Sequence, residues 1–238
     1  MNISVISTKG GTGKSTLVAL LAYSKVLQSA FESICIVELD PQGTLAKWWK
    51  KRKKSGFDLG KVRLVSIYGT DRDAIEPAVN GLIQAHDLLL FDPPGESESK
   101  IHTQFAHAIA DMTLIQMRTT TKDEDAFDNL DTIIRQYRKL KKSNEVYIVP
   151  AFTHPNSKPD GFVDYFESWL PEYVRCLPVA FPNRSEFENY DRGGTNLIES
   201  INEITNTKER IKALKSVNEI ESIAEIIIKQ WQNLQKAS

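Results

Sequence analysis

The sequence has few cysteines and no long hydrophobic segment. Its two cysteines, Cys35 and Cys176, are too far apart to form a metal-binding cluster by spacing, and Cys35 falls in an apolar run typical of a buried strand. No stretch approaches the roughly 18 apolar residues that span a bilayer, and the N-terminus lacks a basic segment followed by a long apolar one. These absences predict a cytoplasmic protein without a membrane partner.

An excess of charge of one sign is also missing. Lys and Arg number 30 against 31 Asp and Glu, for a formal net charge of -1. The whole molecule is therefore not attracted to nucleic acid or anionic lipid, although a local basic patch is not excluded. Hydrophobic residues make up 41% of the 238 positions, an ordinary share for a globular protein. We expect one domain over residues 1–238.

Short apolar runs alternate with longer helical patterns along the chain. The predicted strands cover residues 3–7, 33–39, 63–67, 87–91, 111–117, 145–152 and 174–180. The predicted helices cover residues 15–28, 73–84, 123–140 and 218–234. This alternation predicts an α/β fold, in which a single, mostly parallel, twisted sheet carries helices on both faces.

A glycine-rich loop follows the first predicted strand, with the sequence Lys9-Gly10-Gly11-Thr12-Gly13-Lys14-Ser15-Thr16. Glycines allow backbone N–H groups to converge on a phosphate, and the helix that follows adds its positive end. Lys14 would reach the β- and γ-phosphates, and the Ser15 hydroxyl would bind Mg²⁺. A dinucleotide-binding loop is excluded because Thr16 stands where that motif needs its third glycine. The loop therefore predicts ATP and magnesium binding by residues 9–16.

The start of this loop departs from the general phosphate-loop pattern. Thr8 replaces the usual first glycine, and Lys9 follows it. The segment resembles the deviant Walker A motif of the ParA/MinD ATPases, a class of P-loop NTPases. The resemblance implies that Lys9 reaches across an ATP-dependent homodimer to the phosphates of the partner subunit. It therefore makes Lys9 a catalytic residue beside Lys14.

Two aspartates close predicted strands at the sheet edge where α/β proteins bind ligands. Asp92 precedes Pro93-Pro94-Gly95 and resembles the family's Walker B segment, which implies that it holds magnesium. Asp40 opens Asp40-Pro41-Gln42-Gly43 and resembles switch I, which implies that it orients the attacking water and lies at the metal with Ser15. A simple turn or helix-capping role is the alternative for both. The motifs supply no arginine finger, so we expect slow ATP hydrolysis that a partner accelerates.

The segments that would contact the purine are less clearly marked. Pro182 and Arg184 resemble the family segment that follows a late strand and contacts the base, but a structural loop fits them equally well. Residues 152–156 occupy the other place where relatives contact the base, without the family's usual residues, and that assignment stays open.

Two basic clusters are candidates for binding DNA without sequence preference, because Lys and Arg contacts to phosphates suffice for such binding. A solvated helix end explains either one as well. The clusters are residues 50–54; and Arg135, Arg138, Lys139, Lys141 and Lys142. The resemblance to the ParA/MinD ATPases also implies basic residues near the carboxyl-terminal part, where the candidates are Arg184, Arg192, Lys208, Arg210, Lys212 and Lys215.

The resemblance points to the small partition ATPases, which lack a DNA-reading domain before the phosphate loop, and Trp48 stands at a spacing seen in them. It implies a cytoplasmic, nucleoid-associated ATPase that segregates DNA with a separate DNA-binding adaptor, of ParB or ribbon-helix-helix type, which stimulates hydrolysis. One alternative is the ParA-like accessory ATPase of T-DNA transfer. Another is a MinD-like membrane positioner, although we expect the isoleucine stripe of the last helix to pack in the core.

Overall fold

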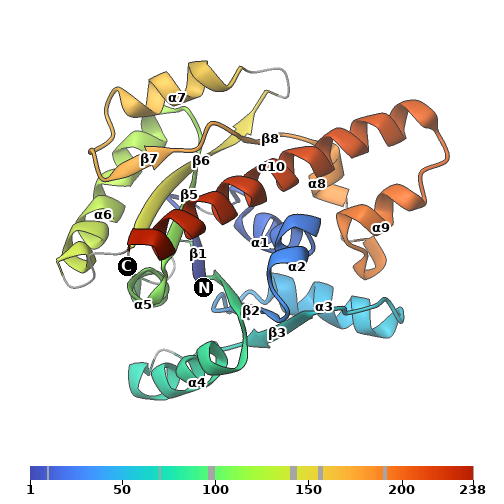
Figure 1. Cartoon of the computed structure of the whole chain (residues 1–238), viewed down its shortest axis with the longest axis horizontal. Coiled ribbons are helices and arrows are strands. Elements are labelled where there is room, and N and C mark those ends of the chain that lie inside the picture. Colours follow the sequence, from blue (N-terminus) through green and yellow to red (C-terminus); the bar gives the residue numbers. More distant parts are fainter. Residues whose placement is uncertain are drawn as a thin grey trace.

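The computed structural model describes residues 1–9, 11–69, 71–95, 100–139, 144–154, 158–189 and 192–237. Its centre is one sheet in the order β3-β2-β4-β1-β5-β6-β7, with β8 paired to β6, and every pairing is parallel (Figure 1). The strands are β1 (Asn2–Ser7), β2 (Ile34–Glu38), β3 (Val62–Ser66), β4 (Leu88–Asp92), β5 (Met112–Met117), β6 (Glu145–Thr153), β7 (Val174–Cys176) and β8 (Phe181–Pro182). The predicted parallel α/β fold is confirmed.

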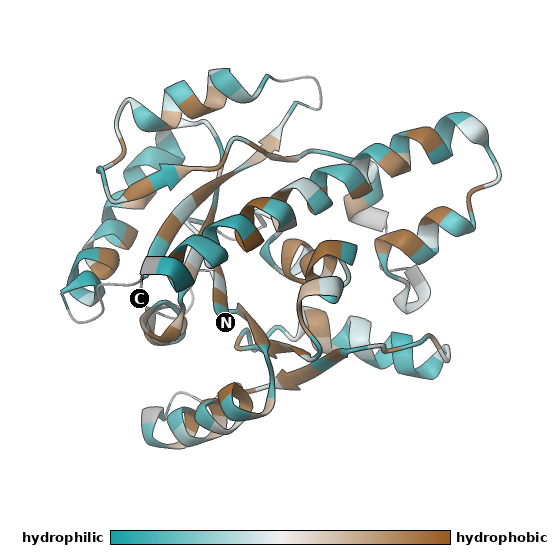
Figure 2. Cartoon of the chain, in the orientation of Figure 1, coloured by the Kyte–Doolittle hydropathy of each residue, from teal (hydrophilic) through white to brown (hydrophobic). Residues whose placement is uncertain are grey.

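Most residues of the central strands are apolar because helices cover both faces of the sheet. In β2, Ile34 and Ile36 pack in one core cluster, whereas Cys35 and Val37 pack in another on the opposite face. Figure 2 shows hydrophobic residues concentrated along these strands. A hydrophobic core therefore packs on each face of the sheet, and the ends of the strands remain available for a ligand-binding site.

One face of the sheet carries the helix that follows the phosphate loop. Its helices are α1 (Lys14–Ala22), α2 (Lys25–Ala30), α3 (Thr44–Lys54), α8 (Ser185–Asn189), α9 (Leu197–Asn202) and α10 (Thr207–Ala237). The opposite face carries α4 (Arg72–Ala85), α5 (Lys100–Ile109), α6 (Thr121–Arg138) and α7 (Pro159–Glu167). A 3₁₀ turn, η1 (Arg192–Gly194), lies against α3.

Three predicted elements differ from the structure for local reasons. The first predicted helix is broken before α2, because the Ser24 side chain caps α2 by accepting a bond from the Leu27 amide at 3.1 Å. The predicted strand over 174–180 stops at Cys176, and Pro178 follows, which has no N–H for a ladder. The last helix begins at Thr207 rather than near 218, since the Asn206 side chain accepts bonds from the first-turn amides.

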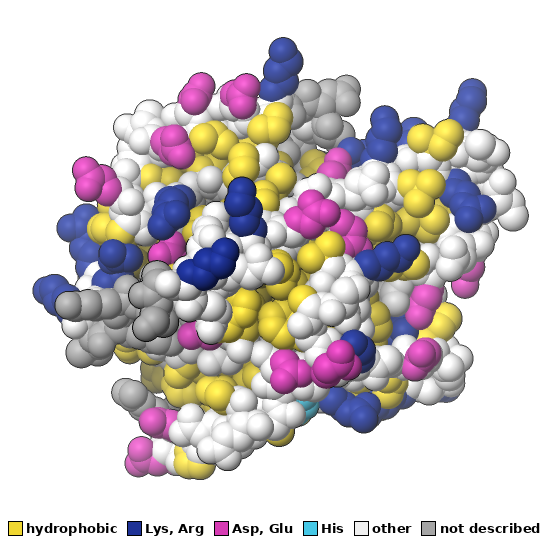
Figure 3. Space-filling view, in the orientation of Figure 1, with side chains coloured by type: hydrophobic (Ala, Val, Ile, Leu, Met, Phe, Trp, Pro, Cys, Tyr) yellow, Lys and Arg dark blue, Asp and Glu magenta, His cyan; other side chains and the backbone are white. Residues whose placement is uncertain are grey.

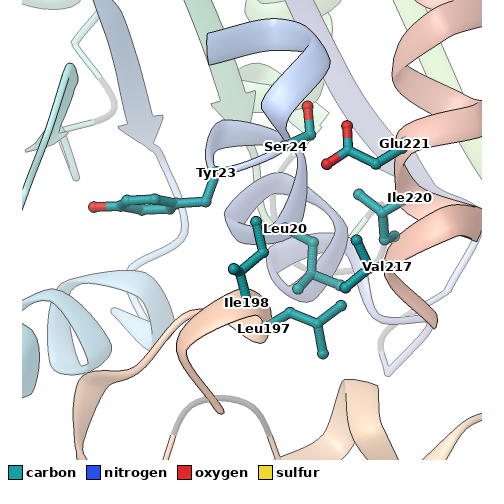
Figure 4. Close-up of a pocket in the computed structure, with 8 residues that line it drawn as sticks. All are labelled: Leu20, Tyr23, Ser24, Leu197, Ile198, Val217, Ile220 and Glu221. Carbon is teal, nitrogen blue, oxygen red and sulfur yellow. The ribbon is translucent and has the colours of Figure 1, made fainter. Parts of the chain in front are cut away.

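The isoleucine stripe of α10 packs in the core, as predicted: Ile220, Ile223 and Ile227 are at most 3% exposed. The helix docks on α1 and α2, where Glu221 accepts bonds from the Lys25 and Val26 amides at 2.8 and 3.0 Å. Figure 4 shows Glu221 beside Ser24, above side chains that close on a cavity of only about 10 Å³. This interface is therefore a structural contact and has no room for a ligand. Among the described residues, no helix is long and apolar enough to cross a bilayer.

Arg52 differs from the other members of the basic cluster at residues 50–54. It is 0% exposed, and its guanidinium donates to both carboxylate oxygens of Glu199 at 2.6 and 2.7 Å. The planar guanidinium suits such a two-pronged contact and also lies 4.6 Å from the centre of the Tyr23 ring. Gly194 completes this packing, because a Cβ there would collide with the Arg52 backbone nitrogen. The lysines at 50, 51, 53 and 54 are exposed.

Candidate nucleotide-binding site

The phosphate loop leaves the sheet at the end of β1, which lies between β4 and β5 in the middle of the sheet. Ligands of open α/β sheets bind at such a carboxyl edge. The loop enters α1 through Gly13, which has φ 84°, a left-handed conformation that favours glycine. A Cβ at Gly13 would also lie 2.9 Å from the Phe181 ring of β8, so only glycine fits. Gly10 lies outside the described residues.

Lys14 and Ser15 form the first turn of α1, directly below the loop. Lys14 is 7% exposed, and the Ser15 hydroxyl donates to Asp92 Oδ2 at 2.6 Å. Thr16 is half-buried in the same turn. The structure thus brings the predicted phosphate-binding lysine, the predicted magnesium-binding hydroxyl and the Walker B-like aspartate together at one edge.

Asp92 ends β4 and is completely buried. Burial raises its pKa from 3.8 to about 7, against the opposing effects of the Lys14 charge and the Ser15 hydrogen bond. Glu38 and Asp40 raise that pKa further, so negative charge accumulates at this edge. Asp40 itself is 8% exposed and accepts a bond from the Gln42 amide at 2.9 Å. The two predicted aspartates therefore lie close enough for their charges to interact.

The residues at this edge fit a magnesium ion shared with a nucleotide. Asp92 Oδ1 is buried without a hydrogen-bond partner among the described residues, and its other oxygen contacts Ser15. The described chain holds no group of three or more His, Cys, Asp or Glu that could bind a metal alone. Mg²⁺ ordinarily takes one or two protein carboxylates and completes its shell with phosphate oxygens and water. Asp92 and Ser15 would supply the protein ligands, with Asp40 beside them.

Glu38 supports the loop that carries Asp40, and the sequence reasoning missed it. Its buried carboxylate accepts bonds from the Leu45 amide at 2.7 Å, the Ser66 hydroxyl at 3.0 Å and the Tyr68 hydroxyl at 2.7 Å. It therefore ties the start of α3 to the end of β3. A charged residue inside the otherwise apolar run of β2 was the available signal.

Lys9 points away from its own loop, toward the start of α6. Its side chain is 42% exposed, and Nζ donates to the Lys122 carbonyl at 2.6 Å, with Asp123 Oδ2 at 3.9 Å. Thr8 donates to the other Asp123 oxygen at 3.0 Å, and Thr120 also bonds this carboxylate. Asp123 is thus a second missed residue. Thr8 occupies the place of a glycine because its hydroxyl has this partner.

Pro182 and Arg184 lie on the β8 side of the site, and their purine contacts remain a prediction. Arg184 donates to Glu219 of α10 at 2.6 Å and is only 12% exposed on its side chain. Pro182 lines a cavity of about 240 Å³ together with His154. His154 also lines a larger cavity of about 600 Å³ with Phe152, where the open segment 152–156 begins. Pro155 and Asn156 of that segment lie outside the described residues.

A strand, a glycine loop, and a helix that opens with Lys14 and Ser15 against Asp92 together define a phosphate-loop nucleotide-binding domain. The chain belongs to the CobQ/CobB/MinD/ParA nucleotide-binding domain family, whose model matches residues 3–234. No curated protein matches it at a significant level of sequence similarity.

Solved structures share the fold at low sequence identity. A plasmid partition protein of Borrelia burgdorferi, solved with AMPPNP bound, is 17% identical at a TM-score of 0.65 and aligns over 96% of this chain and 98% of its own. MinD in the MinC:MinD complex of Aquifex aeolicus is 14% identical at 0.68 over 95% of both chains. Apo McdA of Cyanothece is 18% identical at 0.59 over 92% and 98%. These structures share the fold of the chain, in agreement with the family that the sequence match shows.

Proposed function

We propose that this protein is an ATPase that dimerises on ATP and positions or segregates DNA together with a separate DNA-binding adaptor. The observation that carries the proposal is the pairing of two lysines at the phosphate loop. Lys14 is enclosed at the start of α1, whereas Lys9 is 42% exposed on its side chain at the outer end of the loop. An exposed lysine at this place can reach a nucleotide held by a second copy.

The chain's own residues would carry hydrolysis by positioning and charge neutralisation. Lys14 would neutralise charge on the β- and γ-phosphates, and Asp40 would orient the attacking water. Magnesium, when bound at Ser15 and Asp92, would offset the charge of the phosphates. Nothing in this set supplies an arginine, so we propose a slow basal rate. Lys9 of each subunit would add charge at the other subunit's site, which makes turnover depend on the dimer.

DNA binding is proposed for two exposed basic surfaces. The lysine surface consists of Lys50, Lys51, Lys53 and Lys54 on α3, all exposed. The α10 surface consists of Lys208, Arg210, Lys212 and Lys215, also exposed, in the first turns of that helix. Figure 3 shows Lys and Arg side chains over the outer end of α10. Both surfaces suit phosphate contacts without base reading.

The remaining basic residues contribute less to this proposal. Arg135 is paired with Asp131 at 2.7 Å, and the Arg138 guanidinium lies 4.7 Å from the centre of the Tyr173 ring. Arg184 is held by Glu219. Lys141, Lys142 and the side chain of Arg192 lie outside the described residues.

DNA segregation is favoured over membrane positioning because the apolar stripe of α10 is buried in the core and is therefore not available to bind a membrane. The proposed location is the cytoplasm, at the nucleoid. A role in DNA transfer would use the same chemistry, and a neighbouring gene for a small centromere-binding protein would assign partition.

The decisive test is gel filtration of an Asp40→Ala variant, which should bind ATP and fail to hydrolyse it. We expect a monomer without nucleotide and a dimer with ATP and magnesium. The wild type should hydrolyse ATP slowly, and DNA with the adaptor should accelerate it. An Asp40→Ala protein that binds ATP and stays monomeric would contradict the shared site.

A further inference from the structure

Gln116 lies near the carboxyl end of β5, and its side chain is completely buried. Neither its carboxamide oxygen nor its nitrogen has a hydrogen-bond partner in the described part of the chain. Burying a carboxamide without partners is costly, and buried polar groups in folded proteins are nearly always paired. The unpaired carboxamide of Gln116 in β5 therefore needs a hydrogen-bond partner, which nucleotide binding or a movement of the neighbouring loop would supply.

Strand register places Gln116 beside the start of the phosphate loop. It pairs with Ser7 of β1 on one side and with Val149 of β6 on the other. Leu114 of the same strand packs in the cluster of α1, and Ile115 packs in the cluster of α6. Because side chains alternate along a strand, Gln116 lies on the α1 face of the sheet. That is the face to which the phosphate loop crosses when it enters α1.

The loop itself contains a matching unpaired group. Thr12 is 2% exposed, and its hydroxyl oxygen also lacks a partner among the described residues. The ring of Phe181 in β8 approaches Gly13 closely and covers this part of the face. Two unpaired polar side chains thus belong to segments that meet at the nucleotide edge. A carboxamide can donate to a peptide carbonyl and accept from a peptide N–H at once, which suits the backbone of a glycine-rich loop.

We propose that Gln116 is a positioning residue of the ATP site, whose carboxamide hydrogen-bonds the backbone of the phosphate loop when nucleotide is bound. It thereby holds the loop's N–H groups toward the phosphates. The inference rests on the ATP binding proposed above, and it adds a residue outside the loop and both aspartate segments.

Gln116→Leu tests this inference because leucine has a similar size and no polar atom. Without nucleotide, the variant should be more stable, with Tm higher by about 2–4 °C, since an unpaired buried amide is removed. Its Kd for ATP with magnesium should rise about tenfold, as expected when one hydrogen bond is removed. In steady state, KM for ATP should rise while kcat changes little, because the loop holds substrate and transition state alike. Thermal unfolding, calorimetric titration and ATPase kinetics measure the three effects.

Ser4→Ala is the matched control. The Ser4 hydroxyl is likewise buried without a partner in the described chain, but it pairs with Phe91 and Thr113, away from the loop. This control should raise Tm and leave the ATP Kd unchanged.

Two results for Gln116→Leu would overturn the inference: an ATP Kd equal to that of the wild type, as when a water satisfies the amide, or a lowered Tm without nucleotide. A wild-type protein that ATP does not stabilise would instead overturn the proposed function.

Discussion

Lys9 and Lys14 carry the two positive charges of the phosphate loop in different surroundings. Lys14 lies enclosed in the first turn of α1, close enough to Asp92 for its charge to lower the pKa of that carboxyl group. Lys9 instead contacts the first turn of α6, with its side chain 42% exposed. Lys14 thus belongs to the nucleotide site of its own chain, whereas Lys9 is exposed and can contact a second molecule.

Alanine at each lysine should therefore give separable defects. Lys14→Ala should weaken ATP binding by about 100-fold, because the variant loses the charged hydrogen bonds from the lysine that contacts the β- and γ-phosphates. Lys9→Ala should bind ATP within about threefold of the wild type but lose the ATP-dependent dimer and its hydrolysis. Nucleotide titration and light scattering measure the two effects. A Lys9→Ala protein that still dimerises on ATP would exclude the sharing of lysines between subunits.

Asp92 should make stability depend on pH in the absence of magnesium. Its pKa is raised from 3.8 to about 7 by burial, so between these values the folded protein keeps a proton that the unfolded chain has released. The free energy of unfolding should therefore fall as pH rises from about 4 to about 7. Asp92→Asn should remove this slope and be more stable than the wild type above pH 7, by about 2–4 kcal/mol. Urea unfolding in EDTA at several pH values checks it.

The same variant should bind ATP with magnesium poorly, because Asn offers no charge to the ion. A variant whose stability changes with pH as steeply as that of the wild type would show that Asp92 does not titrate in this range.

At the scale of elements, the sequence predicted the strands best. Strands β1, β2, β4 and β5 are mostly apolar because both faces of the sheet are buried, and they lie within a residue or two of their predicted ends. Helices α3, α5, α7, α8 and α9 were not predicted, because they are short or covered on one side only. The break before α2 depends on one serine cap, which periodicity does not reveal.

Among the residues of the site, those in local sequence motifs could be predicted, and those placed by long-range contacts could not. Ser15 and Asp92 could be predicted because each stands in a motif next to a strand. Asp123 and Gln116 could not be predicted. Asp123 contacts Thr8, which lies 115 residues away in the sequence. Gln116 is placed beside the phosphate loop only by the order of the strands in the sheet. The burial of Arg52 could not be predicted for a related reason: its partner Glu199 lies 147 residues away.

Arg52→Met should test how strongly α3 is tied to α9. Removing the guanidinium leaves the Glu199 carboxylate with only the Asn196 amide as a donor among the described residues, and it removes the donor to the carbonyl oxygens of Gly194 and Asp58. We expect a loss of about 3–5 kcal/mol in the free energy of unfolding, measured by urea denaturation. Lys53→Met, on the exposed side of the same helix, should cost less than about 0.5 kcal/mol. Equal effects of the two changes would contradict a structural role for the buried pair.

At the scale of the whole molecule, the net charge of -1 hides two local basic surfaces. The lysine surface of α3 and the α10 surface each hold four exposed basic side chains. Each surface is replaced in turn, with all four of its basic residues changed to Gln. For the surface that binds DNA, the slope of log K against log[salt] should become less negative by about 0.9 for each phosphate that the variant no longer neutralises.

Comparing the two quadruple variants identifies the surface, since each serves as the control for the other. Binding isotherms on a duplex of unrelated sequence at several salt concentrations give the slopes. Unchanged slopes in both variants would exclude both surfaces, and binding that persists at high salt would exclude a mainly electrostatic mode.

The contact between Arg52 and Glu199 also affects the order in which parts of the fold can form while the chain is being synthesised. Arg52 leaves the ribosome 147 residues before its partner, which at typical elongation rates of about 5–20 residues per second means a delay of roughly 7–30 s. Throughout that interval Arg52 has only partners that are already synthesised, such as the Asp58 carbonyl and the Tyr23 ring, so burying it would leave its charge without a carboxylate. We therefore expect the tight packing of α3 to form only after α9 has emerged.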